Sequence, residues 1–136
     1  MQLVSMVAKW NPLALKVLMI FMGVLLVVGS ALGAWGASFF PFDKDLGVTG
    51  IVAGMAFGAG VTIAGFDPEA NVSWVRAVIL YCIIEVVYEI VDQIAIARFD
   101  IVAFLIAIVV GGLLLFLYPN KSALWMSTGN TMPHKA

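Results

Sequence analysis

Charged residues are scarce in this chain of 136 residues: they make up 11% of it, and the formal net charge is −1. A soluble domain carries about twice that share of charge. Hydrophobic residues make up 63% of the chain, and the mean hydropathy is +1.10. The composition therefore predicts an integral membrane protein in contact with the lipid bilayer. Without an excess of basic residues, there is no electrostatic basis for binding nucleic acid.

Histidine and cysteine each occur once, as His134 and Cys82. A single cysteine excludes a disulfide within the chain. A single histidine excludes the usual metal or haem site that several histidines of one chain build. The sequence also contains no nucleophile–base pair, phosphate-binding loop or dinucleotide fingerprint. We therefore expect a protein that is not an enzyme and that binds no metal and no cofactor.

What remains is a series of long apolar runs separated by short polar turns. About 20 apolar residues cross a hydrocarbon layer of ~30 Å as a helix. The sequence predicts an all-α integral membrane four-helix bundle made of two antiparallel hairpins. The four membrane helices are expected at about 13–36, 46–65, 68–97 and 101–118. A cleavable signal peptide is the alternative for the first of them.

Polar and proline residues mark the ends of these segments. Residues 1–12 are expected to form an interfacial segment, with Asn11 and Pro12 starting the first membrane helix. Asp67 followed by Pro68 predicts the start of the third helix in the same way. Asp100 is expected to cap the fourth helix, and residues 119–136 form a polar C-terminal tail.

Four membrane helices place both termini on one side, and the basic residues show which side that is. The terminal side would carry five of them, and the other side would carry Lys44 and Arg98. The positive-inside rule then places the N- and C-termini in the cytoplasm. The layout of two hairpins with a glycine-rich second helix resembles small bacterial four-helix membrane proteins such as the DoxX-like group. That likeness implies a bacterial inner membrane, and it is one of architecture that assigns no residue a role.

Glycine is concentrated on one face of the second segment. Five glycines fall within about 80° of one another on a helical wheel: Gly47, Gly50, Gly54, Gly58 and Gly65. In lipid, such a face lets another helix approach closely. We predict that it is a helix-packing interface. Its partner would be a neighbouring helix of the same chain or, alternatively, a helix of another subunit.

Three carboxylates interrupt the third apolar segment. Glu85, Glu89 and Asp92 project within about 60° of one another on a helix, and Tyr81 and Tyr88 flank the same stripe. No lysine or arginine lies at that depth in any segment, and a charge in hydrocarbon costs several kcal/mol. We therefore expect these residues to bind a proton, an ion or a cationic partner. The alternative is a closed hydrogen-bond network that fixes helix packing.

Two functional hypotheses of different class follow. The first is a small non-enzymatic accessory or structural subunit, which packs with other membrane protein subunits of a larger complex through its glycine-rich helix, its acids and its tail. The alternative is an oligomeric proton or cation channel or transporter that uses Glu85, Glu89 and Asp92. A third hypothesis, lipid or quinone handling, would need an apolar cavity beside the tyrosines.

Overall fold

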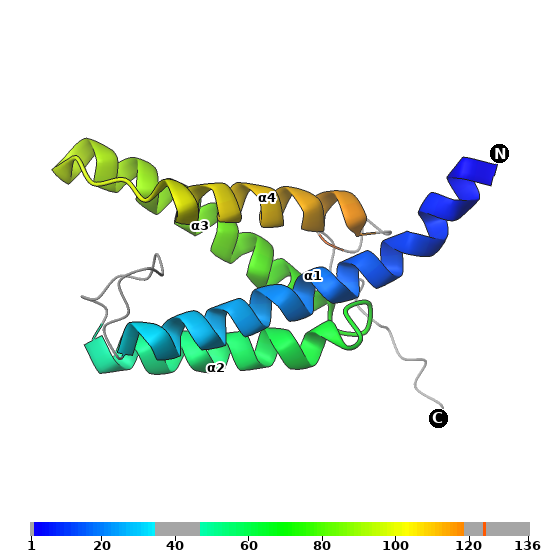
Figure 1. Cartoon of the computed structure of the whole chain (residues 1–136), viewed down its shortest axis with the longest axis horizontal. Coiled ribbons are helices and arrows are strands. Elements are labelled where there is room, and N and C mark those ends of the chain that lie inside the picture. Colours follow the sequence, from blue (N-terminus) through cyan, green and yellow to red (C-terminus); the bar gives the residue numbers. More distant parts are fainter. Residues whose placement is uncertain (1, 35–46, 119–123, 125–136) are drawn as a thin grey trace, which may run out of the picture.

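The computed structural model describes residues 2–34, 47–118 and 124, and these residues form four α-helices and no strand. The helices are α1 (Gln2–Ala34), α2 (Gly47–Gly65), α3 (Val72–Ile96) and α4 (Ile101–Leu117). Successive helices run in opposite directions, so the α2–α3 turn and the end of α4 lie at the same end of the molecule (Figure 1). The predicted loop before α2 and, apart from Leu124, the predicted tail lie outside the described residues.

The first helix is longer than the sequence suggested. α1 runs without interruption from Gln2 to Ala34 with Pro12 inside it, whereas we predicted a separate interfacial segment and a new helix starting at Pro12. Proline removes one backbone hydrogen bond from a helix and usually bends it. Figure 1 shows the N-terminal part of α1 bending away from the other helices and projecting beyond them.

Only part of the predicted set of membrane helices meets the length and polarity required for crossing. Among the described residues, the stretch Pro12–Gly33 is long and apolar enough to cross a membrane. The apolar stretches Thr49–Gly65 and Ile101–Leu117 are shorter, and α3 contains three carboxylates. Over residues 2–34 and 47–118, the structure therefore shows four helices in an all-α fold, with one candidate membrane span.

The α1–α2 contact depends on glycine. A Cβ atom on Gly58 would lie 2.8 Å from the carbonyl oxygen of Gly23 and 2.8 Å from the backbone nitrogen of Val27. Likewise, a Cβ on Gly54 would collide with the hydroxyl of Ser30. The two backbones are thus closer together than side chains at these positions would allow, which gives the helix contact that the glycine face predicts.

The glycine face of α2 is therefore directed at α1 of the same chain. Gly65 also faces α1, because a Cβ there would lie 2.9 Å from Cγ1 of Ile20. Gly50 is only partly buried near the start of α2, which begins at Gly47. Of the two partners that the sequence allows for this face, the structure places the neighbouring helix on Gly54, Gly58 and Gly65.

The apolar core lies toward the end of the molecule that holds the α2–α3 turn. All four helices contribute side chains that are completely or almost completely buried: Leu15, Met19, Val61, Val75, Val78 and Leu114. Tyr118, which follows α4, is buried at the same end. At this end of the molecule, buried apolar side chains of both hairpins pack against one another.

The sequence predicted the start of α4 correctly but not the start of α3. α3 begins at Val72, not at Pro68 as predicted, because Asp67 closes a turn instead of capping the helix. Its side chain accepts a hydrogen bond from the backbone of Ala70 (3.2 Å), and its backbone oxygen accepts one from the side chain of Asn71 (2.8 Å). Asp100, by contrast, caps α4 as the sequence predicts.

Candidate functional site

One stripe of α3 begins against α2. Trp74, Tyr81, Glu85, Tyr88 and Asp92 lie within about 60° of one another at 100° per residue. The centre of the Phe57 ring of α2 lies 5.9 Å from that of Trp74 and 5.7 Å from that of Tyr81. The Trp74 ring also lies against Gly60 of α2, where a Cβ would overlap it. α2 therefore covers this stripe as far as Tyr81.

Beyond Tyr81 the stripe continues without α2. Figure 1 shows α3 crossing away from α2, so the α3–α4 turn lies far from the α1–α2 pair. Between residues 83 and 96 the only buried residue is Glu89. The exposed fractions are 57% for Ile84, 54% for Val87 and 81% for Ile94. The second half of α3 therefore packs mainly against α4, and the rest of its surface is open.

Glu89 binds the start of α4. Its side chain is 7% exposed, and Oε2 accepts a hydrogen bond of 2.8 Å from the backbone N–H of Asp100. The carboxylate of Asp100 in turn accepts hydrogen bonds from the backbone N–H groups of Val102 (2.9 Å) and Ala103 (3.1 Å). Backbone N–H groups at a helix start have no partner within the helix, and the helix dipole favours negative charge there. Glu89 thus has a structural partner within its own chain.

Glu85 lies one turn before Glu89 and has no such partner. Its side chain is half-buried, and no hydrogen bond to its carboxylate occurs within the described part of the chain. The charged groups that act on it most strongly, Glu89 and Asp100, are themselves acidic. Arg76 and Arg98 lie toward opposite ends of α3, about 13 and 20 Å from Glu85 along the helix axis at 1.5 Å per residue. Glu85 is therefore a carboxylate in acidic surroundings on an open helix face.

The remaining stripe residues reach the tip of the hairpin. Tyr88 is 49% exposed, and Asp92 is half-buried. The backbone oxygen of Asp92 accepts hydrogen bonds from Ala97 and Arg98 where α3 ends. Tyr81, Glu85, Tyr88 and Asp92 thus share one face, as the sequence predicts from their spacing, and Glu89 at the edge of that face turns to α4.

The sequence allowed Glu89 a structural role in a hydrogen-bond network but did not identify the start of α4 as its partner, although a signal was present. A turn as short as Arg98–Asp100 brings the last turns of α3 beside the first turn of α4. An acid two to three turns before such a turn can therefore reach the free N–H groups of the next helix. Cys82 lies two turns before Glu89 on the same side of α3, where it is buried against Gly111 of α4.

The acids do not gather into a ligand set. Within the described residues, no group of three or more histidine, cysteine, aspartate or glutamate side chains is placed to hold a metal ion. Glu89 is held at the α4 N-terminus, and Glu85 projects one turn away from it. What the arrangement offers is the half-buried carboxylate of Glu85, with that of Asp92 two turns further along the same stripe, and a lone carboxylate such as Glu85 suits recognition of one positive or hydrogen-bonding group.

Comparisons with protein families, with curated proteins and with solved structures gave no match. The function of this chain must therefore be inferred from its own residues and their geometry.

Proposed function

We propose that this chain is a small non-enzymatic membrane protein that acts as an accessory subunit of a larger membrane assembly, and that it contacts its partner through the second half of α3. The observation that carries the proposal is the contrast within that segment. Apart from the side that packs against α4, where Glu89 is buried and Val86 is partly buried, its surface is exposed, and it presents the half-buried carboxylate of Glu85 without a hydrogen bond among the described residues.

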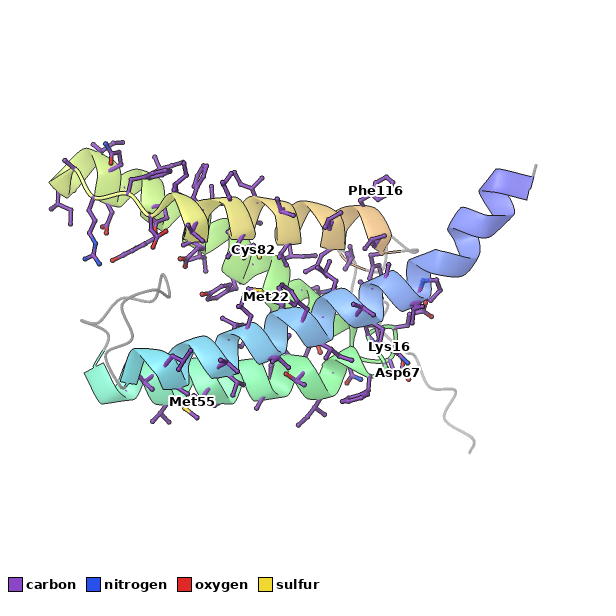
Figure 2. All side chains as sticks on the ribbon, viewed as in Figure 1. Lys16, Met22, Met55, Asp67, Cys82 and Phe116 are labelled. Carbon is purple, nitrogen blue, oxygen red and sulfur yellow. The ribbon has the colours of Figure 1, made fainter. Side chains whose placement is uncertain are left out.

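The exposed surface supports insertion into a membrane. Large apolar side chains project outward from several helices, with exposed fractions of 71% for Ile63, 67% for Phe116 and 38% for Met55. Figure 2 shows Met55 and Phe116 projecting from opposite outer sides of the molecule, whereas Met22 and Cys82 lie between the hairpins. Water penalises apolar surface by about 25 cal/mol per Å², and lipid does not. A hydrocarbon environment therefore suits this surface, in agreement with the candidate span Pro12–Gly33.

Lipid alone does not suit the second half of α3. An ionised carboxylate in hydrocarbon costs several kcal/mol, and such residues usually face protein or a water-filled space. Because α2 ends its contact with α3 near Tyr81, none of the four described helices covers Glu85 on that side. A polar group on a second protein would remove the cost.

The proposed contact surface is one of the parts that the sequence hypothesis named, namely the acids. The glycine face of α2 was another, as the alternative to a contact with a helix of the same chain, and α1 occupies that face at Gly54, Gly58 and Gly65. It is thus not available to another chain unless the hairpin opens. Large apolar side chains are exposed on every helix, but the second half of α3 combines such a surface with the acids.

The alternative of a proton or cation channel is less well supported by the geometry. A path along Glu85, Glu89 and Asp92 would need Glu89 to exchange protons or bind ions while it accepts the Asp100 N–H. Each such step would disturb the start of α4. The test of this alternative is proton or cation flux in liposomes, where Glu85→Gln must reduce the flux of the wild type if the alternative holds.

Photo-crosslinking in native membranes tests the subunit proposal. A photoreactive amino acid is placed at Ile84 or Val91, which border the Glu85 stripe on the second half of α3, and at Ile63 on α2 as an exposed control. We expect a discrete adduct with one other membrane protein from positions 84 and 91 and none from position 63. If no position gives a discrete adduct and the chain is a stable monomer in mild detergent, the proposal fails.

A further inference from the structure

We infer that the second half of α3 docks a transmembrane helix that carries a lysine or arginine at the depth of Glu85. This inference rests on the proposed function and specifies the chemistry of the partner. Two observations on the same helix carry it, namely the apolar face that α2 leaves uncovered beyond Tyr81 and the charge balance around Glu85.

The charge balance selects a cation. Of the acids near the hairpin tip, Glu89 and Asp100 bind the backbone N–H groups at the start of α4. Glu85 has no hydrogen bond within the described residues, and the acids beside it make the site more negative. A second acid or a purely apolar helix would leave this charge buried and uncompensated, which is the costly case. A basic side chain would compensate it.

The surrounding surface selects a helix over a free ion. One carboxylate is too few for a site that holds Mg²⁺ or Ca²⁺, which take several oxygen ligands, and no cluster of three such residues occurs in the described chain. On one side of Glu85, the exposed side chains of Ile84, Tyr88 and Val91 extend the contact surface along α3. From Ile83 to Ile94 the open segment is about 17 Å long at 1.5 Å per residue. That length matches three turns of a packed helix.

The occupant is therefore defined by charge complementarity: an apolar helix with one basic side chain, with its apolar residues on Ile84 and Val91 and its cation at Glu85. A lysine or arginine in a membrane helix has the same need of a counter-charge, because alone it is as costly as the acid. Pairing the two removes both penalties at once, and it fixes the depth at which the helices meet.

The test uses synthetic transmembrane helices as the probe. One peptide of leucine and alanine carries a single central lysine, and the matched peptide carries leucine instead. Binding of each to the donor-labelled full chain is measured by energy transfer in phosphatidylcholine liposomes. We expect the wild type to bind the lysine peptide about tenfold more tightly than the leucine peptide, Glu85→Gln to lose this preference, and Glu89→Gln to retain it.

A charge swap guards against an unfolded variant. Glu85→Lys should prefer a peptide with a central glutamate over the lysine peptide, which an unfolded or merely weakened protein would not do. Equal binding of the lysine and leucine peptides by the wild type, or a lysine preference that survives in Glu85→Gln, would overturn the inference. If that happens while positions 84 and 91 still crosslink to a discrete partner in native membranes, the subunit proposal stands and only the basic partner is wrong.

Discussion

The two helical hairpins of this molecule are held together by different means. α1 and α2 form the most extensive helix contact in the structure, and glycines bring their backbones together at Gly23, Gly54 and Gly58. In α3 and α4 the contact is smaller, with Cys82 against Gly111 and the carboxylate of Glu89 on the start of α4. Close backbone packing thus holds the first hairpin together. In the second hairpin a hydrogen bond to a carboxylate joins the helices, and one side of α3 remains exposed.

The same difference occurs within α3, between two acids one turn apart. Glu89 is buried and binds a backbone N–H of α4, whereas Glu85 is half-buried on the open face. The two glutamates thus have different surroundings, because α4 lies beside Glu89 and α2 has already diverged from α3 at Glu85. The comparison predicts that the two hairpins, and the two acids, respond differently to matched substitutions.

The largest effect is expected at the α1–α2 contact. In Gly58→Ala the new methyl group would lie 2.8 Å from backbone atoms of α1, so the helices must separate. Overpacking of this kind costs about 1–3 kcal/mol. Gly112→Ala is the matched control, since nothing lies within 4 Å of a Cβ there, and alanine favours a helix by about 1 kcal/mol over glycine.

The measurement is the free energy of unfolding by sodium dodecyl sulfate from mild detergent micelles. Gly58→Ala should lower it, and Gly112→Ala should leave it unchanged or raise it. Equal losses in the two variants would mean that the close contact at Gly58 does not hold the first hairpin together.

A smaller effect is expected at the start of α4. Asp100→Ala removes the acceptor for the N–H groups of Val102 and Ala103, and loss of such a cap costs about 1 kcal/mol. Asp100→Asn keeps an acceptor oxygen and should lose less. Hydrogen exchange resolved by residue should show faster exchange in the first turn of α4 and no change in α1 or α2. Faster exchange throughout all four helices would contradict the claim that different interactions hold the two hairpins together.

The smallest effect is expected at the end of α3. Ala97 adopts a left-handed conformation with φ of 54°, which costs a residue with a Cβ roughly 1–2 kcal/mol relative to glycine. Ala97→Gly should therefore stabilise the α3–α4 turn, although glycine also gains entropy in the unfolded chain, so we expect a net gain below about 1 kcal/mol. The midpoint of thermal unfolding should rise slightly, and a clear fall would show that the turn gains nothing from relief of this conformation.

Local signals in the sequence were sufficient for much of the fold. The short turn at Arg98–Asp100 and the cap at Asp100 could be recognised from neighbouring residues alone, and so could the spacing that puts Gly54 and Gly58 on one face. The starts of two helices, α1 and α3, could not be predicted from neighbouring residues. α1 passes through Pro12, and α3 begins only at Val72 because Asp67 closes a turn with Ala70 and Asn71.

The candidate site shows where local reasoning ends. The helical period placed Glu85, Glu89 and Asp92 near one another, but the period of a single helix does not say which neighbouring helix each side chain meets. That outcome depends on α4 lying beside Glu89 and on α2 diverging beyond Tyr81, and both are properties of the assembled fold. The stripe was thus predictable, and the division of tasks along it was not.

The most direct measurement of the central claim compares Glu85→Leu with Glu89→Leu in the isolated chain. Glu89→Leu leaves the Asp100 N–H without its acceptor and should lower the free energy of unfolding in detergent micelles by about 1–3 kcal/mol. Glu85→Leu removes an acid that has no hydrogen bond within the described chain, so it should leave that free energy unchanged or raise it. Equal destabilisation by the two substitutions would show that Glu85 is already satisfied within its own molecule, and the account of an open docking face on α3 would be wrong.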